Sequence, residues 1–82
     1  MLDYTHTICA PATSVGSGAI SIIRISGPDA LAVVDRVVSF SSGTAADAPG
    51  YSVRYGDASG LDEVLVTVFR APHSYTGEDA AE

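Results

Sequence analysis

The segment that most constrains the fold is residues 19–26, with the sequence A-I-S-I-I-R-I-S. Its two alternating faces are both largely apolar, which is typical of a β-strand that is covered on both sides. The next residues, Gly27-Pro28-Asp29, change the period. Pro28 suits the first position of a helix, and Asp29 places a negative charge at the positive end of the helix dipole. The pattern predicts a buried strand followed directly by a helix.

The predicted helix runs over about residues 28–39. Its apolar residues recur at helical spacing and are Ala30, Val33, Val34, Val37 and Val38. Asp35 and Arg36 fall outside this stripe, so we expect both side chains to face solvent.

The flanking sequence predicts one strand, one turn and one loop. Residues 5–10 are rich in β-branched side chains and precede Pro11, which cannot donate to a strand ladder, so they predict a short strand. Gly16 and Gly18 indicate a turn. Residues 39–50 are small and polar without any period, which predicts a weakly ordered loop.

Residues 51–55 and 63–70 have the composition of two strands, joined through a Gly- and Asp-containing loop at residues 56–60. They predict a hairpin, and the second strand, E-V-L-V-T-V-F-R, is apolar enough to be central in a sheet. The order strand, strand, helix, strand, strand predicts an α+β fold or a mixed α/β layer, with the helix packed on the sheet.

The chain has 82 residues, of which 46% are hydrophobic. A domain this small buries only about 60% of the surface that its unfolded chain exposes, so we expect a fragment or an oligomer. The polar stretch at the end, A-P-H-S-Y-T-G-E-D-A-A-E, has the character of an interrupted sequence. We therefore expect a fold that is incomplete at its C-terminus.

Charge argues against nucleic-acid contact by this segment. Ten acidic residues face four Arg and no Lys, which gives a net charge of −6, whereas a phosphate backbone is bound by basic surfaces. Without Lys the chain also has no P-loop, so nucleotide hydrolysis by this segment alone is not expected. Gly16 and Gly18 supply only half of a dinucleotide-binding motif, and an ordinary turn is the favoured interpretation.

The remaining reactive side chains predict no catalytic and no metal site. Cys9 is the single cysteine, which fits a reducing cytosol, and its spacing from His6 points the two to opposite faces of a strand. We expect Cys9 to fill a small gap in the core and His6 to lie near an edge. His73 and Ser74 lack the pattern of a nucleophile elbow. No apolar run approaches the roughly 20 residues that span a bilayer, and no basic start suggests export.

Arg24 interrupts the apolar strand on the same face as Ile20 and Ile22. A guanidinium there needs a partner, because burying it alone is costly. That partner is either a carboxylate of this chain or the carboxylate of a bound ligand, which a planar guanidinium suits.

The sequence Thr76-Gly77-Glu78-Asp79 has two interpretations as well. It is an acidic turn that leads into the next element, or one of the nearby carboxylates faces a pocket. In a pocket, a carboxylate would accept hydrogen bonds from the amino and ring N–H groups of a pterin or purine.

Three segments together resemble a known family. They are D-Y-T-H-T-I-C-A-P-A-T, G-A-I-S-I-I-R-I-S-G and H-S-Y-T-G-E-D-A-A-E, and their spacing is kept across essentially the whole chain. In these motifs the chain resembles the N-terminal domain of the MnmE (TrmE) family of tRNA-modification GTPases. The resemblance implies that residues 1–82 are a truncated N-terminal domain, without the helical and GTPase domains that follow it in the family.

The resemblance also implies a tetrahydrofolate-binding fold like that of the aminomethyltransferases, which homodimerises and binds a tetrahydrofolate derivative of the 5-formyl or 5,10-methylene type. By motif position, Arg24 and Glu82 are the expected folate-contacting residues, and both position the cofactor without catalysing bond chemistry. GTP, magnesium and potassium belong to the GTPase domain. The family acts in the cytoplasm with a flavin-containing MnmG (GidA)-type partner to modify the wobble uridine of certain tRNAs.

Two other functions remain open at this point. One is a purely structural dimerisation module that binds no ligand in this fragment. The other is a free-standing one-carbon transferase of the aminomethyltransferase type, which ranks last because its active site requires a much longer chain.

Overall fold

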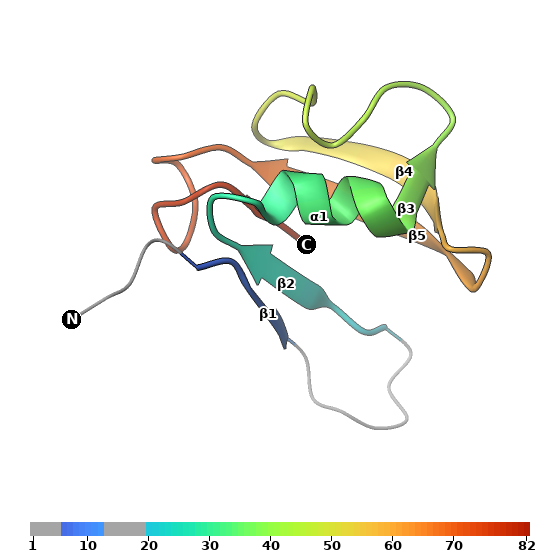
Figure 1. Cartoon of the computed structure of the whole chain (residues 1–82), viewed down its shortest axis with the longest axis horizontal. Helices are drawn as coiled ribbons and strands as arrows, with labels where there is room; N and C mark the ends of the chain where they lie inside the picture. The colour runs from blue at the N-terminus through green and yellow to red at the C-terminus, as the bar shows by residue number, and fades with distance from the viewer. Residues whose placement is uncertain (1–5, 13–19) are drawn as a thin grey trace.

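The computed structural model describes residues 6–12 and 20–82. Over these residues the chain forms one helix, α1 (Ala30–Val37), and six strands (Figure 1): β1 (Ile8–Pro11), β2 (Ile23–Ser26), β3 (Val38–Phe40), β4 (Ser52–Ala58), β5 (Asp62–Phe69) and β6 (Ala80–Ala81). The turn predicted at Gly16 and Gly18 lies outside the described residues.

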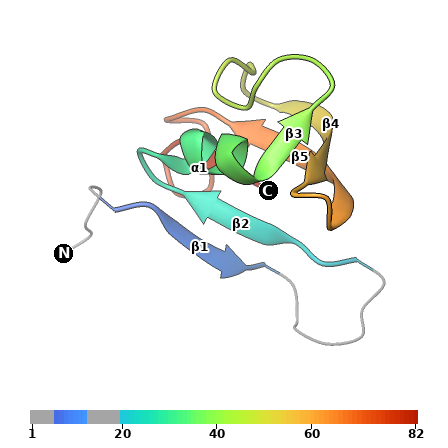
Figure 2. The same cartoon turned by 45° about the vertical axis from the view of Figure 1, so that its right-hand side comes forward.

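The strands form one sheet in the order β1-β2-β6-β5-β4-β3, and every neighbouring pair is antiparallel. The helix packs against one face of this sheet, in contact with β6 and β3. In both Figure 1 and Figure 2, β1 and β2 extend beyond the helix. The result is an α+β fold in which a single helix covers only part of one sheet face.

The core lies between α1, the loop after β3 and the helix-covered face of the sheet. Its buried residues are Leu31, Val34, Ala45, Ala48, Val66, Val68 and Ala81. A glycine keeps the outer strand close to this core, since a Cβ on Gly56 would lie 2.5 Å from Cγ1 of Val38. Two alanines of the loop thus complete the hydrophobic layer that α1 begins.

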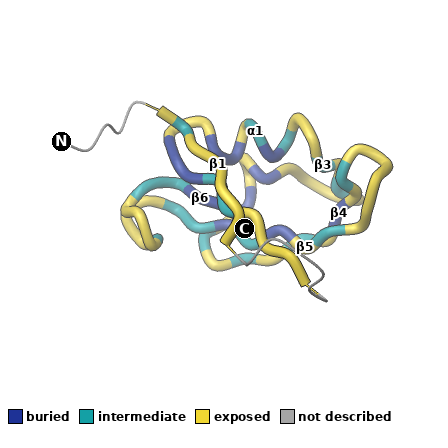
Figure 3. The backbone as a smooth tube through the Cα atoms, turned by 90° about the horizontal axis from the view of Figure 1, so that it is seen from below, coloured by how far each residue is buried: buried dark blue, intermediate teal, exposed yellow. Residues whose placement is uncertain are grey.

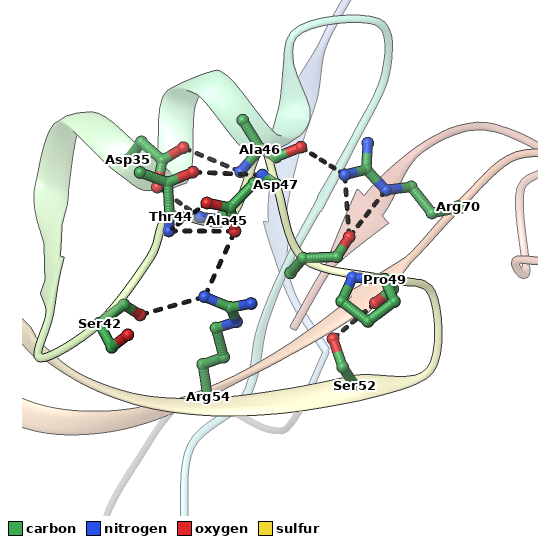
Figure 4. A network of polar contacts seen from close by, with 11 residues as sticks. Asp35, Ser42, Thr44, Ala45, Ala46, Asp47, Pro49, Ser52, Arg54 and Arg70 are labelled. Carbon is green, nitrogen blue, oxygen red and sulfur yellow. Dashed lines mark hydrogen bonds and ion pairs between the residues drawn. The ribbon is translucent and has the colours of Figure 1, made fainter.

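The loop at residues 41–51 is held by hydrogen bonds, contrary to the predicted weak order (Figure 4). The backbone N–H groups of Ala45 and Ala46 donate to the Asp35 carboxylate, at 2.7 and 3.0 Å. Asp35 is therefore half-buried and bonded, not directed to solvent as expected, whereas Arg36 is exposed. Weak order was predicted because the loop residues are small and have no period. The loop is ordered nevertheless, because side chains from other elements bind its backbone.

Two arginines of the sheet bind the same loop from its other side (Figure 4). Arg70 donates from Nη2 to the carbonyl oxygens of Ala46 and Ala48, at 2.5 and 2.9 Å. Arg54 donates from Nη1 to the Ser42 carbonyl at 3.0 Å. These bonds connect the loop to β4 and to the residue that follows β5.

The first two strands are shorter and less covered than predicted. β2 begins at Ile23 although a strand was expected from residue 19, and Ile20, Ile22 and Ile23 are exposed. The expected cover on both faces is therefore wrong for this chain, because its only described helix lies over the middle of the sheet. β1 covers residues 8–11 rather than 5–10, with Pro11 on an edge strand where its missing N–H is harmless.

Cys9 is exposed, so its predicted place in the core is wrong. It lies on β1, at the edge of the sheet beyond the helix (Figure 1). A cysteine spaced like a core residue stays in solvent here because no second layer reaches this edge.

The helix begins and ends inside its predicted range. It stops at Val37 because Val38 is extended, with φ −118° and ψ 128°, and starts β3. Ala30 and Val34 of the predicted stripe are buried, Leu31 is buried in addition, and Val37 is 48% exposed. Sequence reasoning missed β3 because its first valine fits the helical period equally well.

The predicted hairpin is confirmed, with β5 central between β6 and β4. The turn is shorter than expected, since β4 continues to Ala58 and β5 starts at Asp62. β6 was missed because two alanines carry no recognisable strand pattern. Within the described residues, no helix is long and apolar enough to cross a membrane.

Candidate functional site

The candidate site lies on the face of the sheet opposite α1, here called the open face. Side chains alternate along β5, so Val66 and Val68 enter the core while Leu65, Thr67 and Phe69 point to the open face. The strand register brings Val53 and Tyr55 of β4 to the same side. Four of the exposed large side chains on this part of the molecule are Tyr51, Val53, Tyr55 and Leu65.

Arg24 and Glu82 meet on the open face. The pairing of Ile25 with Ala81 continues by one residue and sets Arg24 of β2 opposite Glu82. Arg24 Nε donates to Glu82 Oε2 at 2.6 Å, and Arg24 Nη2 forms an ion pair with the same oxygen. The Glu82 backbone is fixed by reciprocal hydrogen bonds with Thr67, at 2.8 and 2.9 Å. Two residues separated by 58 positions are thus held together by the middle of the sheet.

The pair is only partly removed from water. The Arg24 side chain is 38% exposed and that of Glu82 is 21% exposed. A ligand can therefore reach both groups from the open face. Figure 3 shows that the backbone is exposed along β1, whereas buried segments occur in α1 and β5.

An aromatic row continues from the ion pair. The Arg24 guanidinium lies over the Tyr75 ring, with Cζ 4.8 Å from the ring centroid. Tyr75 packs edge-to-face on Phe69 at 6.5 Å, and Phe69 packs edge-to-face on Tyr51 at 6.1 Å. An open groove accompanies this row and is lined by Tyr51, Phe69, Pro72, His73, Ser74 and Tyr75.

The loop that carries Tyr75 is anchored by polar side chains. Ser26 Oγ and Thr76 Oγ1 share a hydrogen bond of 2.6 Å. The Asp79 carboxylate accepts from the Ala71 N–H at 2.9 Å and lies 3.7 Å from Arg70 Nη1. These contacts fix both ends of the loop between β5 and β6.

The acidic sequence at 76–79 forms a turn, as the first of its two interpretations predicts, whereas the pocket interpretation stays a prediction. Asp79 is part of the turn, since it binds the backbone of Ala71. Glu82, three residues later, is the carboxylate that lies on the open face. Oε2 of Glu78 is a buried oxygen for which the described residues provide no hydrogen-bond donor.

The other reactive residues remain apart. Ser74 donates its hydroxyl to the Glu78 carbonyl at 2.5 Å, so it is engaged by the backbone. His73 lines the groove two residues from Tyr75. Over residues 6–12 and 20–82, no group of three or more His, Cys, Asp or Glu side chains could hold a metal ion.

The structure brings together Arg24 and Glu82, the two residues expected to contact a ligand, whose role as contacts stays a prediction. The side chains around them were not expected. The internal carboxylate that sequence reasoning offered as one possible partner of Arg24 is Glu82. Tyr75, Thr67 and Ser26 were missed because their roles follow from the register of β2, β6 and β5. Tyr75 could have been noticed in the sequence, because it directly precedes T-G-E-D in H-S-Y-T-G-E-D.

The arrangement offers donors and an acceptor at one place. The guanidinium presents N–H donors and the carboxylate presents acceptor oxygens, on a surface flanked by aromatic rings. Such a set can bind a flat heterocycle that carries both a carbonyl and amino or ring N–H groups. Binding and orientation of such a heterocycle are the chemistry that these donors, acceptors and rings support.

The chain was compared with known proteins. Residues 7–82 match the family model described as GTP-binding protein TrmE N-terminus. The tRNA modification GTPase MnmE of Parabacteroides distasonis is 42% identical over 93% of this chain and 18% of its own length. The proteins of the same name from Bacteroides fragilis and Christiangramia forsetii are 45% and 47% identical, over 93% and 99% of this chain and 17% and 18% of their own lengths.

The chain thus spans less than a fifth of the length of these relatives. The range matched by the family model includes both Arg24 and Glu82. The chain belongs to the TrmE N-terminal family.

Proposed function

We propose that this chain is the tetrahydrofolate-binding and homodimerisation domain of a tRNA-modification GTPase. In this proposal residues 1–82 are one domain, with the tetrahydrofolate-binding fold of the aminomethyltransferases. Arg24 and Glu82 contact a derivative of the 5-formyl or 5,10-methylene type. The observation that carries the proposal is the Arg24–Glu82 pair on the open face of the sheet.

The residues present fit a pterin. The Glu82 carboxylate accepts from the amino and ring N–H groups of the pterin, and the Arg24 guanidinium donates to its carbonyl oxygen. Tyr75 holds the guanidinium against its ring face and limits the directions in which the donors point. The backbone bonds between Glu82 and Thr67 keep the carboxylate at a fixed height on the sheet.

These side chains bind and orient, and they catalyse no bond chemistry. Folate supplies a one-carbon unit when it is bound. The role of Arg24 and Glu82 is to select the heterocycle and hold its orientation. Asp79 and Arg70 contribute indirectly, by fixing the loop that carries Tyr75.

The remainder of the proposed function belongs to the longer protein. There, a GTPase domain would bind GTP with magnesium and potassium, and an MnmG (GidA)-type flavoprotein would act as partner in modifying the wobble uridine of certain tRNAs in the cytoplasm. The net charge of −6 argues that any tRNA contact is made outside this domain.

The proposed homodimer uses the apolar part of the open face. Tyr51, Val53, Tyr55 and Leu65 are exposed there, next to the Arg24–Glu82 pair. An exposed apolar surface on a small domain favours association, because covering it with a second copy adds the buried area that a small core lacks.

Calorimetric titration of 5-formyl-tetrahydrofolate tests the ligand. The chain should bind saturably, and Arg24→Ala should weaken binding about 30-fold or more, because a charged partner of a polar ligand is worth about 2 kcal/mol or more. Arg36→Ala is the matched control, since Arg36 is exposed on α1 away from the open face. Equal affinity of the chain and Arg24→Ala would refute the assigned anchor.

A purely structural dimerisation module is the second candidate, and the exposed apolar side chains of the open face favour it. Light scattering with and without the folate separates the two. A dimer that forms without ligand and titrates no folate would support the structural module. A dimer that binds folate would support the first proposal in full, whereas a monomer that binds folate would support its ligand and refute its homodimer.

A further inference from the structure

Among the residues that the structure describes, one polar residue is buried, Ser26, which is 2% exposed. It lies two residues after Arg24 on β2, and the residue between them, Ile25, packs against the core. Because side chains alternate along a strand, Ser26 points to the open face, as Arg24 does. A side chain on this face is buried only where another segment covers it.

The covering segment is the loop between β5 and β6, which carries Tyr75 and Thr76. Thr76 Oγ1 and Ser26 Oγ share a hydrogen bond of 2.6 Å. Beside this bond the Tyr75 ring lies against the Arg24 guanidinium, with Cζ 4.8 Å from the ring centroid. Two consecutive residues of the loop thus meet two side chains of β2 that point the same way.

Other hydrogen bonds give the loop its own shape. Ser74 Oγ donates to the Glu78 carbonyl at 2.5 Å, and the Gly77 N–H donates to the Ser74 carbonyl at 3.3 Å. Both bonds stay inside the loop, so they would persist if the middle of the loop moved away from β2. The bond between Ser26 and Thr76 would break in such a movement.

The position of the loop therefore decides the environment of the Ser26 hydroxyl. With the loop closed, this hydroxyl is shielded from water and is paired with Thr76. A buried hydroxyl that loses its partner costs free energy, whereas a hydroxyl in solvent binds water instead. Since Thr76 itself is exposed, removal of its hydroxyl leaves the unpaired group on Ser26 and favours an open loop.

We propose that Ser26 and Thr76 are positioning residues, whose hydrogen bond holds the Tyr75 ring in place. The ring in turn limits the directions in which Arg24 presents its N–H groups. Neither hydroxyl contacts a ligand in this assignment. The consequence for ligand affinity rests on the proposed folate binding, whereas the consequence for Arg24 is present in the ligand-free chain.

NMR of the Arg24 Nε–H group in ligand-free protein reports on the position of Tyr75, because a proton near the face of an aromatic ring is shifted upfield. Tyr75→Leu gives the reference signal without the ring. Thr76→Val replaces the hydroxyl by a methyl group of similar size, and it should move the Arg24 signal most of the way to that reference. Thr76→Ser keeps the hydroxyl and should give the parent signal.

Calorimetry with 5-formyl-tetrahydrofolate measures the affinity of the same variants. Thr76→Val should bind about 5-fold more weakly, as expected for the loss of one hydrogen bond, and Thr76→Ser should bind like the parent. Thr44→Val is the matched control. Thr44 is also exposed, and its hydroxyl accepts from the Asp47 N–H at 3.2 Å, but it lies in the loop over the core. This control should change neither the Arg24 signal nor the affinity.

The outcomes separate this inference from the proposed function. An Arg24 signal that stays at the parent position in Thr76→Val would refute the positioning role, whether or not folate binds. If the signal moves but Thr76→Val binds folate as tightly as the parent, the bond orients Arg24 without serving the ligand, and the assigned role is overturned. If the signal moves and the parent binds no folate, the proposed function is refuted, while the orientation of Arg24 by this bond is supported.

Discussion

The two faces of the sheet are built from the same strands and yet are chemically opposite. Along β5, Val66 and Val68 lie in the core beneath α1, while Leu65, Thr67 and Phe69 reach the open face. The buried side chains of the covered face, such as Val66, Val68 and Ala81, are aliphatic and fill a thin layer. The open face carries an ion pair, aromatic rings and apolar side chains in solvent. The comparison teaches that residue parity within single strands separates the side chains that build the core from those that remain exposed.

The largest expected difference between the two faces comes from replacing one leucine in the core and one leucine on the open face by alanine. Leu31 lies in the core and is 5% exposed. The substitution Leu31→Ala should lower the free energy of unfolding by about 2–4 kcal/mol. Leu65 is 68% exposed on the open face of the single chain, so Leu65→Ala should cost the monomer at most about 0.5 kcal/mol of unfolding free energy. Urea denaturation of both variants, at a dilution where light scattering shows a monomer, measures the difference. Equal losses in the monomer would mean that Leu65 is buried within a single chain.

The loop at residues 41–51 packs over the core on the covered face, and Asp35→Ala tests how much its hydrogen bonds stabilise the fold. Two backbone N–H groups would lose their acceptor, which should lower the unfolding free energy by about 1–2 kcal/mol. Amide hydrogen exchange should become faster at Ala45 and Ala46. The neighbouring variant Arg36→Ala removes an exposed charge and should change stability by no more than about 0.5 kcal/mol. If amide exchange at Ala45 and Ala46 is unchanged in Asp35→Ala, the Asp35 carboxylate does not hold this loop in solution.

The ion pair of the open face should contribute little to stability. Arg24 and Glu82 keep solvent contact, so solvent screening limits the pair to about 1 kcal/mol or less. A double-mutant cycle with Arg24→Ala and Glu82→Ala in ligand-free protein isolates their coupling. A coupling energy of about 3 kcal/mol would instead assign the pair to the structural framework.

The smallest effect concerns a phenol on the open face. A hydrogen bond with Glu63 raises the pKa of Tyr55 above its ordinary 10.0, with desolvation and the charges of Glu63 and Asp57 adding to it. The folded protein thus holds this proton more tightly than the unfolded chain. The resulting stabilisation is fully present below pH 10.0 and is lost as the pH rises through the folded-state pKa.

Carbon NMR of the tyrosine Cζ atoms follows that titration. Glu63→Ala should lower the Tyr55 pKa toward 10.0, because it removes both the hydrogen bond and the nearest charge. Asp62→Ala, next to Glu63 in sequence, should leave the Tyr55 pKa unchanged. A Tyr55 pKa that does not respond to Glu63→Ala would show that the two side chains do not meet in solution.

Local patterns predicted the elements whose residues contact near neighbours in sequence. The hairpin of β4 and β5 and the helix after Gly27-Pro28-Asp29 are examples. Arg24 and Glu82 were selected by resemblance to a known motif, and their role as ligand contacts stays a prediction. β6 was not predictable, since two alanines become a strand only by insertion between β2 and β5. The order of the loop after β3 depends on Asp35 and Arg70, which are distant or on other elements.

The same limit explains the missed parts of the site. The contact between Arg24 and Glu82 is set by the register of three strands, and Tyr75 reaches Arg24 from a loop 51 residues further along the chain. Spacing in the sequence carries no information on such register. Cys9 and the isoleucines around β2 are exposed because the short helix α1 does not extend over β1 and β2. The apolar pattern of a strand does not reveal how much of a sheet a helix will cover.

The two-residue strand β6 has a consequence for how the protein is made. Among the described residues, β2 is joined to the middle of the sheet through Ala80 and Ala81, which also pair with β5. The chain that precedes β6 can form the pair β1–β2 and the sheet β3–β4–β5, but it cannot join them. We expect each part to expose an unpaired strand edge until residues 80 and 81 have been synthesised, so aggregation should compete with folding at this late insertion.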